Sequence, residues 1–339
     1  MRRRAPKHAL ISAWQGTTLA VAAMCCVAAA PVTAQDRAGA PRSTPPSWAY
    51  PVNPPPAPAV TDDSTPLRVP GTVVTFRRSQ TTDRFLVPDW RPAEHPPMPD
   101  VVAHGRRPDV FACGYCHLPN GLGRPENASL AGLPAEYIVE QLRDFKSGRR
   151  RSSEPNMRPP IGMIVVAKGA ADAEVRVAAE YFASLRPSRW IRVVETTTVP
   201  KTRVASSSML VAALEGGREP IDDRIIETAL DLPRTELRDP ASGFVAYVPL
   251  GSIARGRRLV TTGGGKTQAC AACHGPSYRG VGNVPPLAGR SPSYLMRQLY
   301  DFKSGARDGP LAGPMKENVA KLSVEDMTAI TAYLASRRP

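Results

Sequence analysis

Two short motifs bring together side chains that could do chemistry. Cys113, Cys116 and His117 stand in "CGYCH", and Cys270, Cys273 and His274 stand in "CAACH". Apart from Cys25 and Cys26 near the N-terminus, the chain has no other cysteine. The chemistry of the chain therefore depends on what two C-x-x-C-H motifs can hold.

Three kinds of site use such cysteines. A C-x-x-C pair forms a disulfide or a thioredoxin-like redox centre, and two pairs together form a zinc site. None of these three sites explains a histidine directly after each cysteine pair. Covalent haem does, because two thiols add to the porphyrin vinyl groups and the next histidine binds the iron. We therefore predict two c-type haems, held by Cys113, Cys116 and His117, and by Cys270, Cys273 and His274.

A long internal repeat accompanies the motifs. Residues 130–150, "LAGLPAEYIVEQLRDFKSGRR", and 287–307, "LAGRSPSYLMRQLYDFKSGAR", are identical at 12 of 21 positions. They lie 157 residues apart, which is also the separation of the two haem motifs. The chain therefore contains two copies of one haem-binding unit.

The repeated segment has the pattern of a helix. Its shared apolar positions form one stripe at helical spacing. Pro134 and Pro292 suit a helix start, the latter after Ser291 as a possible N-cap, and Gly148 and Gly305 suit a left-handed C-cap. We interpret the repeated DFKSG as a helix ending without a functional role.

The sixth iron ligand is expected just before the last helix of each copy. In the second copy Met315 has this position. The last helices are 152 residues apart, so the first copy holds five extra residues, and in this register Met163 matches Met315. Methionine is a common partner of histidine in electron-transferring haem proteins. We predict His117 with Met163, and His274 with Met315.

Other ligands remain open for the first haem. Met157 is an alternative if the five extra residues follow it, and His95 or His104 is another if no methionine binds. In the second copy, Met296 and Met327 fall within predicted helices, where a core position is expected.

At this point the sequence resembles the class I c-type cytochromes, in particular the two-domain di-haem kind related to cytochrome c-four. The resemblance rests on the two haem motifs with their methionines, on "PPLAGRSPSYLMRQLYDFKSGAR" and on "LSVEDMTAITAYLAS", and covers residues 108–187 and 250–339. It implies mainly α haem domains and single-electron transfer between redox proteins of the periplasm, rather than catalysis.

The resemblance also exposes differences between the copies. The family has a proline carbonyl that accepts a hydrogen bond from the proximal histidine; Pro285 matches it, but Ala128 replaces it in the first copy, which puts that bond in doubt. Before the second motif, Ser252 is expected to cap a helix in which Gly256 lets the last helix approach near Tyr333. The first copy has prolines there and is expected to lack a regular helix. We expect the two haems to differ in exposure and potential.

The remaining segments define the organisation. Residues 1–34 have the pattern of a signal peptide cleaved near Ala34, with a retained membrane anchor as the alternative, and no later run could span a membrane. We assign 35–95 to a Pro-rich extension, with 41–70 an extended linker rather than a packed segment. Residues 96–187 and 250–339 form the cytochrome domains, and 188–249 a partly β connector packed between them.

The net charge and the export signal limit the possible functions. Cleavage would change the net charge from +14 to +10, with the basic residues scattered. Export argues against nucleic acid, and the scattered charge fits either a solvated basic face or docking of an acidic partner. A periplasmic di-haem electron carrier fits best. The alternatives are an electron-transfer subunit of an exported dehydrogenase or oxidase, whose docking surface the connector could form, and a di-haem peroxidase, which would need an open iron site.

Overall fold

A computed structural model describes residues 44–55, 63–205 and 208–339, so the predicted signal peptide lies outside the described residues. Short helices precede the first motif: α1 (Arg78–Thr82), η1 (Pro92–Glu94) and α2 (Asp100–Ala103). The first copy then contains α3 (Cys113–His117), α4 (Ala135–Lys146), α5 (Arg158–Gly169) and α6 (Asp172–Ser184). The second contains α8 (Ser252–Thr262), η2 (Gly263–Gly265), α9 (Ala271–His274), α10 (Pro292–Ser304), α11 (Gly313–Val319) and α12 (Val324–Ser336).

The repeated segments end their helices as the sequence predicts. At the start of α10, the Ser291 hydroxyl accepts a hydrogen bond from the Tyr294 amide, and Pro292 is the first helical residue. After α4 and α10, Gly148 and Gly305 have φ of +75° and +76°, a conformation that a side chain disfavours. The interpretation of DFKSG as a helix ending is confirmed.

The helix before the haem motif differs between the copies. α8 has 11 residues, whereas α2 has four, as the prolines of the first copy predict. A Cβ atom on Gly256 would lie 1.9 Å from the Ala329 carbonyl oxygen of α12, so only glycine permits this approach. The predicted N-cap is wrong: Gly251, with φ of +78°, caps α8 and Ser252 is its first residue.

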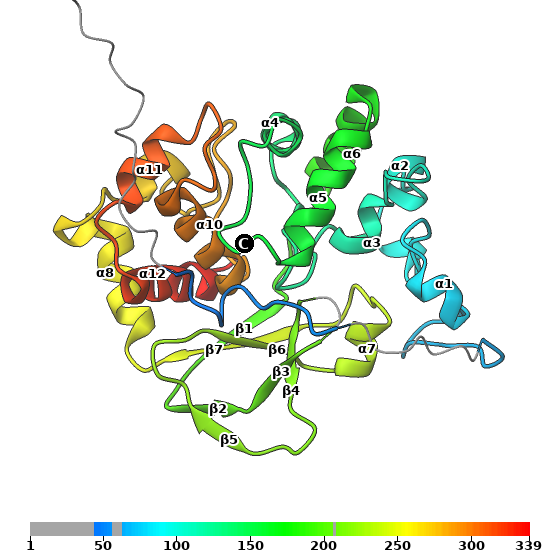
Figure 1. Cartoon of the computed structure of the whole chain (residues 1–339), viewed down its shortest axis with the longest axis horizontal. Coiled ribbons are helices and arrows are strands. Elements are labelled where there is room, and N and C mark those ends of the chain that lie inside the picture. The colour runs from blue at the N-terminus through cyan, green and yellow to red at the C-terminus, as the bar shows by residue number, and fades with distance from the viewer. Residues whose placement is uncertain (1–43, 56–62, 206–207) are drawn as a thin grey trace, which may run out of the picture. The chain divides into compact units, whose positions relative to one another are not determined.

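The connector is partly β, as predicted. It contains β1 (Ile191–Thr196), β2 (Thr198–Pro200), β3 (Thr202–Val204), β4 (Leu210–Ala212), β5 (Arg218–Pro220), β6 (Ile226–Ala229), α7 (Leu232–Glu236) and β7 (Phe244–Pro249). β7 lies between β1, which is parallel to it, and β6, which is antiparallel. β2 pairs with β5 and β3 with β4. Figure 1 shows these strands gathered on one side of the helices of both copies.

Two apolar cores correspond to the two copies within one compact unit, Ser43–Pro339. The first core gathers side chains from α4 and α6 around Phe182, and the second gathers those of α8, α10 and α12 around Met296. The sheet contributes to both, because Phe244 at the start of β7 packs in the first core and Val248 near its end in the second. The connector therefore joins the copies as a shared structural element.

Part of the Pro-rich extension is packed, contrary to the expectation of a linker. Ala49 and Tyr50 are buried in the second core. The Tyr50 hydroxyl donates to Asp301 Oδ1 at 2.8 Å, and Arg297 donates to the Ala49 carbonyl at 2.9 Å. One buried aromatic residue with a polar partner fixes the segment, which proline content alone does not reveal.

Candidate haem sites

Both motif histidines are buried and held in the same way. Nδ1 of His117 lies 2.8 Å from the Ala128 carbonyl oxygen, and Nδ1 of His274 lies 2.8 Å from that of Pro285. The hydrogen bond that the replacement of proline by Ala128 put in doubt is therefore present. A backbone carbonyl accepts it whatever side chain its residue carries. Burial lowers the pKa of both imidazoles, so each is neutral with Nε2 free to bind a metal.

The cysteines of the two motifs lie in different surroundings. Cys113 packs against the first core and Cys270 against the second, so the four cysteines do not form one zinc site. Within the described part of the chain, no three His, Cys, Asp or Glu side chains are grouped to hold a metal ion. Burial raises the pKa of Cys113 to about 12 and that of Cys270 to about 11.

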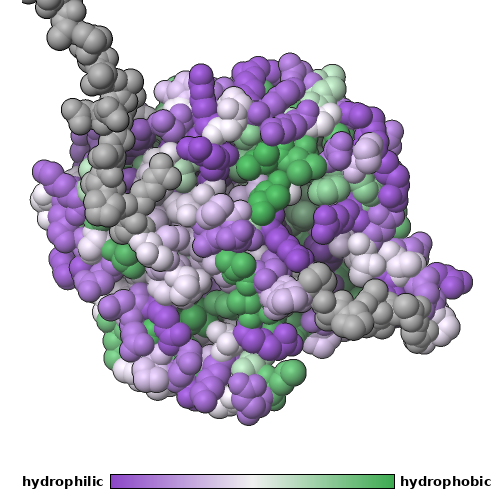
Figure 2. Space-filling view, viewed as in Figure 1, coloured by the Kyte–Doolittle hydropathy of each residue, from purple (hydrophilic) through white to green (hydrophobic). Residues whose placement is uncertain are grey.

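A cavity of about 630 Å³ lies beside the first motif. Its walls are mostly apolar and come largely from α3 to α6, with further residues from the segments before α3 and with Arg238 of the connector. Figure 2 shows apolar side chains gathered in a hollow of this face. Cys113, Cys116 and His117 border the cavity, and so does Met163. This volume is typical of a cofactor pocket, and the donors around it suit a covalently attached haem.

The structure separates the two methionine candidates of the first copy. Met163, in the second turn of α5, lines the same cavity as His117. Met157, which caps α5, is fully buried in the second core, on the other side of the boundary between the copies. α5 has 12 residues where α11 has seven, so part of the extra length of the first copy follows Met157, and the shared cavity rather than the register separates the two methionines.

The other candidates have their own partners. His95 Nε2 lies 3.1 Å from Asp89 Oδ1, a contact that raises the pKa of His95, and His104 is exposed at the end of α2. Neither lines the cavity. In the second copy, Met315 of α11 packs against the same core as Cys270, whereas Met296 and Met327 are fully buried within it.

The two DFKSG segments meet where the copies contact each other. Arg150 and Arg307, two residues beyond each glycine, pair as an isolated antiparallel bridge. Arg150 donates to Gln141 in its own copy and to Tyr294 and Gln298 in the other, at 2.9 to 3.0 Å. Arg307 does the reverse, donating to Gln298 at 3.3 Å and to Tyr137 and Gln141 at 2.7 Å. This network is nearly symmetric.

Two further arginines lie buried near it. Arg290 donates to the carbonyls of Pro286, Ser129 and Ala131, and Arg297 to those of Ala49 and Pro125. Burial lowers the pKa of Arg290 to about 10. Burial raises the pKa of Tyr137, but the charges of Arg307 and Arg150 outweigh this and lower it overall.

All four guanidinium groups thus bond to neutral oxygens. The charge of buried Asp301 acts on Arg150 and Arg297, and that of Glu227 on Arg297, but none of the four arginines forms a salt bridge among the described residues, so they can still receive an anion. Arg150 and Arg297 also border a smaller cavity of about 100 Å³, together with His117 and Met163. The residues therefore fit the carboxylate groups of a haem. Sequence reasoning missed this role, although Arg150 and Arg307 are identical positions of the repeat.

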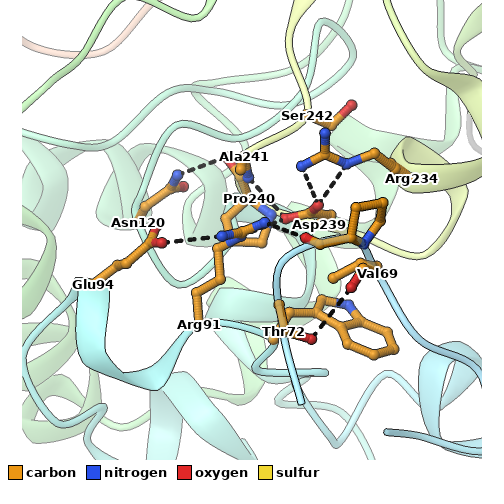
Figure 3. Close-up of polar contacts among 12 residues, drawn as sticks. Val69, Thr72, Arg91, Glu94, Asn120, Arg234, Asp239, Pro240, Ala241 and Ser242 are labelled. Carbon is orange, nitrogen blue, oxygen red and sulfur yellow. Dashed lines mark hydrogen bonds and ion pairs between the residues drawn. The ribbon is translucent and has the colours of Figure 1, made fainter. Parts of the chain in front are cut away.

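A loop of the connector covers the first motif. This cover loop, residues 231–242, places Arg238 over the Tyr115 ring at 3.5 Å and donates from Arg238 to the Tyr115 carbonyl at 2.7 Å. Asn120 donates to the Pro240 carbonyl at 2.9 Å (Figure 3). In consequence residues 121–126, which follow the first motif, are all buried.

Segments before the first motif fasten the cover loop. Asp239, whose side chain is fully buried, accepts from Arg91 at 3.0 Å and pairs with Arg234 at 2.6 Å (Figure 3). Trp90 donates to the Leu237 carbonyl at 2.7 Å. Nothing in the motif itself indicated this cover, because its residues come from distant segments.

Comparison with known proteins decides the family. A model of the cytochrome c family matches residues 253–338. Cytochrome c-554(547) of Halothiobacillus neapolitanus is 37% identical over 76 residues, which are 20% of this chain and 84% of that protein. The chain belongs to the class I c-type cytochromes.

Longer relatives match about two thirds of this cytochrome. The thiosulfate dehydrogenase electron acceptor of Thiomonas intermedia is 27% identical over 236 residues, covering 68% of this chain and 80% of the relative. Cytochrome c4 of Azotobacter vinelandii is 27% identical over 230 residues, covering 66% and 82%. A solved structure, reduced cytochrome c4 from Pseudomonas stutzeri, is 24% identical and covers 67% of this chain and 93% of its own, with a TM-score of 0.43.

These relatives establish the class of chemistry. The chain is a di-haem cytochrome related to cytochrome c4, with two covalently attached c-type haems. It transfers electrons rather than catalysing a reaction. In the described ranges, no helix is both long and apolar enough to cross a bilayer.

Proposed function

We propose that His117 and Met163 bind the first iron and that His274 and Met315 bind the second. The observation that carries this proposal is the shared cavity of His117 and Met163, from which Met157 is excluded by its place in the second core. Each histidine has Nδ1 held by a carbonyl and Nε2 available. Met315 packs against the same core as Cys270, as the register argument requires.

The remaining residues prepare the sites for electron exchange. When bound, each haem supplies an iron that changes between the ferric and ferrous states by one electron. The thiols of the two motifs fix its position, and the apolar walls exclude water. We take residues 96–187 and 250–339 as the two haem domains, joined by the connector 188–249. At the boundary between these domains, negative groups of the haems are held by Arg150, Arg290, Arg297 and Arg307. This arrangement favours electron exchange within the chain.

We place the cytochrome in the periplasm, exported by the signal peptide 1–34. Its donor would be a dehydrogenase, as the name of the Thiomonas relative says of that protein, and its acceptor another cytochrome or an oxidase. A second candidate is an electron-transfer subunit in fixed partnership with such an enzyme. The connector favours it, because it adds surface that neither haem copy provides.

A spectrum of the ferric holoprotein tests the ligands. We expect the near-infrared methionine-to-iron charge-transfer band at an intensity of two haem equivalents. A high-spin haem together with turnover of peroxide would contradict the carrier function and favour a peroxidase.

A further inference from the structure

The two carbonyls that hold the motif histidines stand on loops of different composition. In the second copy, Pro285 and the residue after it, Pro286, each have a φ angle that the proline ring restricts. In the first copy the matching residues are Ala128 and Ser129, which have no such restriction. The distance from Nδ1 to the carbonyl oxygen is nevertheless 2.8 Å in both sites. The first loop therefore needs another source of rigidity to reach the same geometry.

Backbone hydrogen bonds within each copy do not supply this rigidity, because they are the same in both loops. The amides of Leu130 and Ala131 donate to the Gly121 carbonyl at 2.7 and 3.0 Å. In the second copy the matching amides donate to the Tyr278 carbonyl at 2.8 and 3.1 Å. This equal support does not compensate for the prolines that the first loop lacks.

Arg290 of the second copy reaches across the boundary to the first loop. Its buried guanidinium donates through Nη1 to the Ser129 carbonyl, and through Nη2 to the Ala131 carbonyl at 3.2 Å. Through Nε it donates to the Pro286 carbonyl of its own copy at 2.7 Å. Ser129 and Pro286 are matching positions, each directly after the residue whose carbonyl holds a motif histidine. One guanidinium thus joins the loops that hold the histidines of both haem sites.

The backbone that carries this arginine is itself fixed. The Gly289 amide donates to the Leu334 carbonyl of α12 at 3.0 Å, and Ser291 caps α10. Burial lowers the pKa of Arg290 to about 10, which leaves its guanidinium charged at neutral pH. Hydrogen bonds from a charged donor are stronger than those between neutral groups. A guanidinium has more N–H groups than nitrogens, so Arg290 can make these bonds and still face an anion.

The support runs in one direction only. Leu133 has the position in the first copy that matches Arg290, and its buried apolar side chain has no hydrogen-bond donor. The first copy therefore cannot hold the second loop from this position. The second loop has less need of it, because its two prolines already restrict the backbone.

We propose that Arg290 is a positioning residue for the first haem: from the second copy it holds the loop whose Ala128 carbonyl orients His117, and so replaces the prolines of the second site. The proposal rests on the proposed binding of the first iron by His117. A hydrogen bond at Nδ1 fixes the ring of a metal-bound histidine and strengthens it as a ligand. The first iron ligand thus depends on contact between the two copies, whereas the second is held within its own copy.

Proton NMR of the ferrous holoprotein tests the proposal, through the rates at which the Nδ1 protons of His117 and His274 exchange with solvent. We expect Arg290→Gln to speed exchange at His117 by roughly fivefold to tenfold, because the Ala128 carbonyl loses the support of its loop. Exchange at His274 should change by less than about twofold, because prolines restrict its loop. Arg290→Lys, which keeps the charge and can still donate to a carbonyl, should give a rate at His117 between those of the native protein and Arg290→Gln.

A compensating substitution separates positioning from a general loss of stability. Ala128→Pro gives the first loop the proline that the second has at the matching position, where the Nδ1 distance is the same. Added to Arg290→Gln, it should return exchange at His117 toward the native rate. Unchanged exchange at His117 in Arg290→Gln, equal acceleration at both histidines, or failure of this rescue would overturn the role of Arg290. If Arg290→Gln does not fold, the two histidines of Arg290→Lys decide in the same way.

The same spectra test the iron ligand separately. The ring current of a porphyrin shifts the ring protons of an iron-bound histidine strongly upfield. Absence of this shift at His117 in the native protein would contradict the proposed ligand itself, and with it the proposal. A shifted His117 whose exchange does not respond to Arg290→Gln would contradict only the role of Arg290.

Discussion

The two haem copies share the geometry of the proximal ligand and differ in almost everything around it. Both histidines are held by a carbonyl at 2.8 Å, eleven residues further along the chain. The loop after the first motif is buried under the connector, whereas the loop after the second is exposed. Duplication therefore preserved the features that orient the iron ligand and left the surrounding surface free to change.

This difference bears on the reduction potentials. A haem shielded from water is harder to oxidise, because the ferric state carries one more positive charge and loses more from burial. Basic side chains near a haem act in the same direction. We expect the cover of the first site to favour its reduced state, and the arginine network to influence both sites.

The largest expected effect separates the two methionines of the first copy. Met163→Ala should remove half of the near-infrared band and lower one of the two potentials, because the thioether that favours ferrous iron is lost. Met157→Ala should keep the full band but destabilise the fold by about 2–4 kcal/mol, because it leaves a cavity in the second core. Spectra and chemical unfolding of both variants check this; loss of the band in Met157→Ala alone would reverse the assignment.

The next largest effect is on stability, and it concerns the arginine network to which both copies contribute in nearly the same way. Arg150→Gln and Arg307→Gln should each destabilise the holoprotein by about 2–3 kcal/mol, because buried hydrogen bonds to the same two glutamines are lost. The double variant should cost less than the sum, since the residues share partners. Unfolding of the three variants measures this. If one of the two single variants left the free energy of unfolding unchanged, the two arginines would not contribute equally to the network.

A smaller effect compares matching acids of the last helices. Asp326 pairs with Lys266 at 2.6 Å and Arg255 at 2.7 Å, and despite burial these contacts lower the pKa of Asp326. Its stabilising effect is complete above the ordinary carboxyl pKa near 4 and is lost as pH falls through the lower folded-state value. Asp326→Asn should cost about 1–3 kcal/mol at pH 7 and progressively less in acid.

Glu174, the residue in register with Asp326, provides the control. It pairs with Arg106 at 2.8 Å but is more exposed, with 23% of its side chain accessible against 2% for Asp326. Glu174→Gln should therefore cost less than about 1 kcal/mol at pH 7. Unfolding of both variants between about pH 3 and pH 7 checks the comparison, because this range includes the ordinary carboxyl pKa of roughly 4. An equal loss of stability in the two variants would contradict it.

Local features were predictable from the sequence because they depend on neighbours in the chain. The helix ending at DFKSG, the short helix before the first motif and the strand after residue 190 all follow from local residue types. The register of the repeat favoured Met163 over Met157 as the second iron ligand of the first haem. The cavity that Met163 shares with His117 supports this assignment. Small errors, such as the N-cap at Ser252 where Gly251 stands, also arise at this level.

Features built from distant segments could not be predicted. The packing of Tyr50, the closure of the arginine network and the cover loop each join residues more than 100 positions apart. The DFKSG segments illustrate this limit. Their role as helix endings is visible locally, whereas the contact between the two endings appears only when both copies have folded together.

Hydroxyl-radical footprinting of the holoprotein tests the central difference between the copies most directly. Pro119 and Pro276 are the same residue type at matching positions, so their labelling rates compare exposure without a correction for reactivity. We predict that Pro276 is labelled several-fold faster than Pro119, because the connector buries the first loop and leaves the second open. Equal rates, or faster labelling of Pro119, would contradict a covered first site and a bare second one.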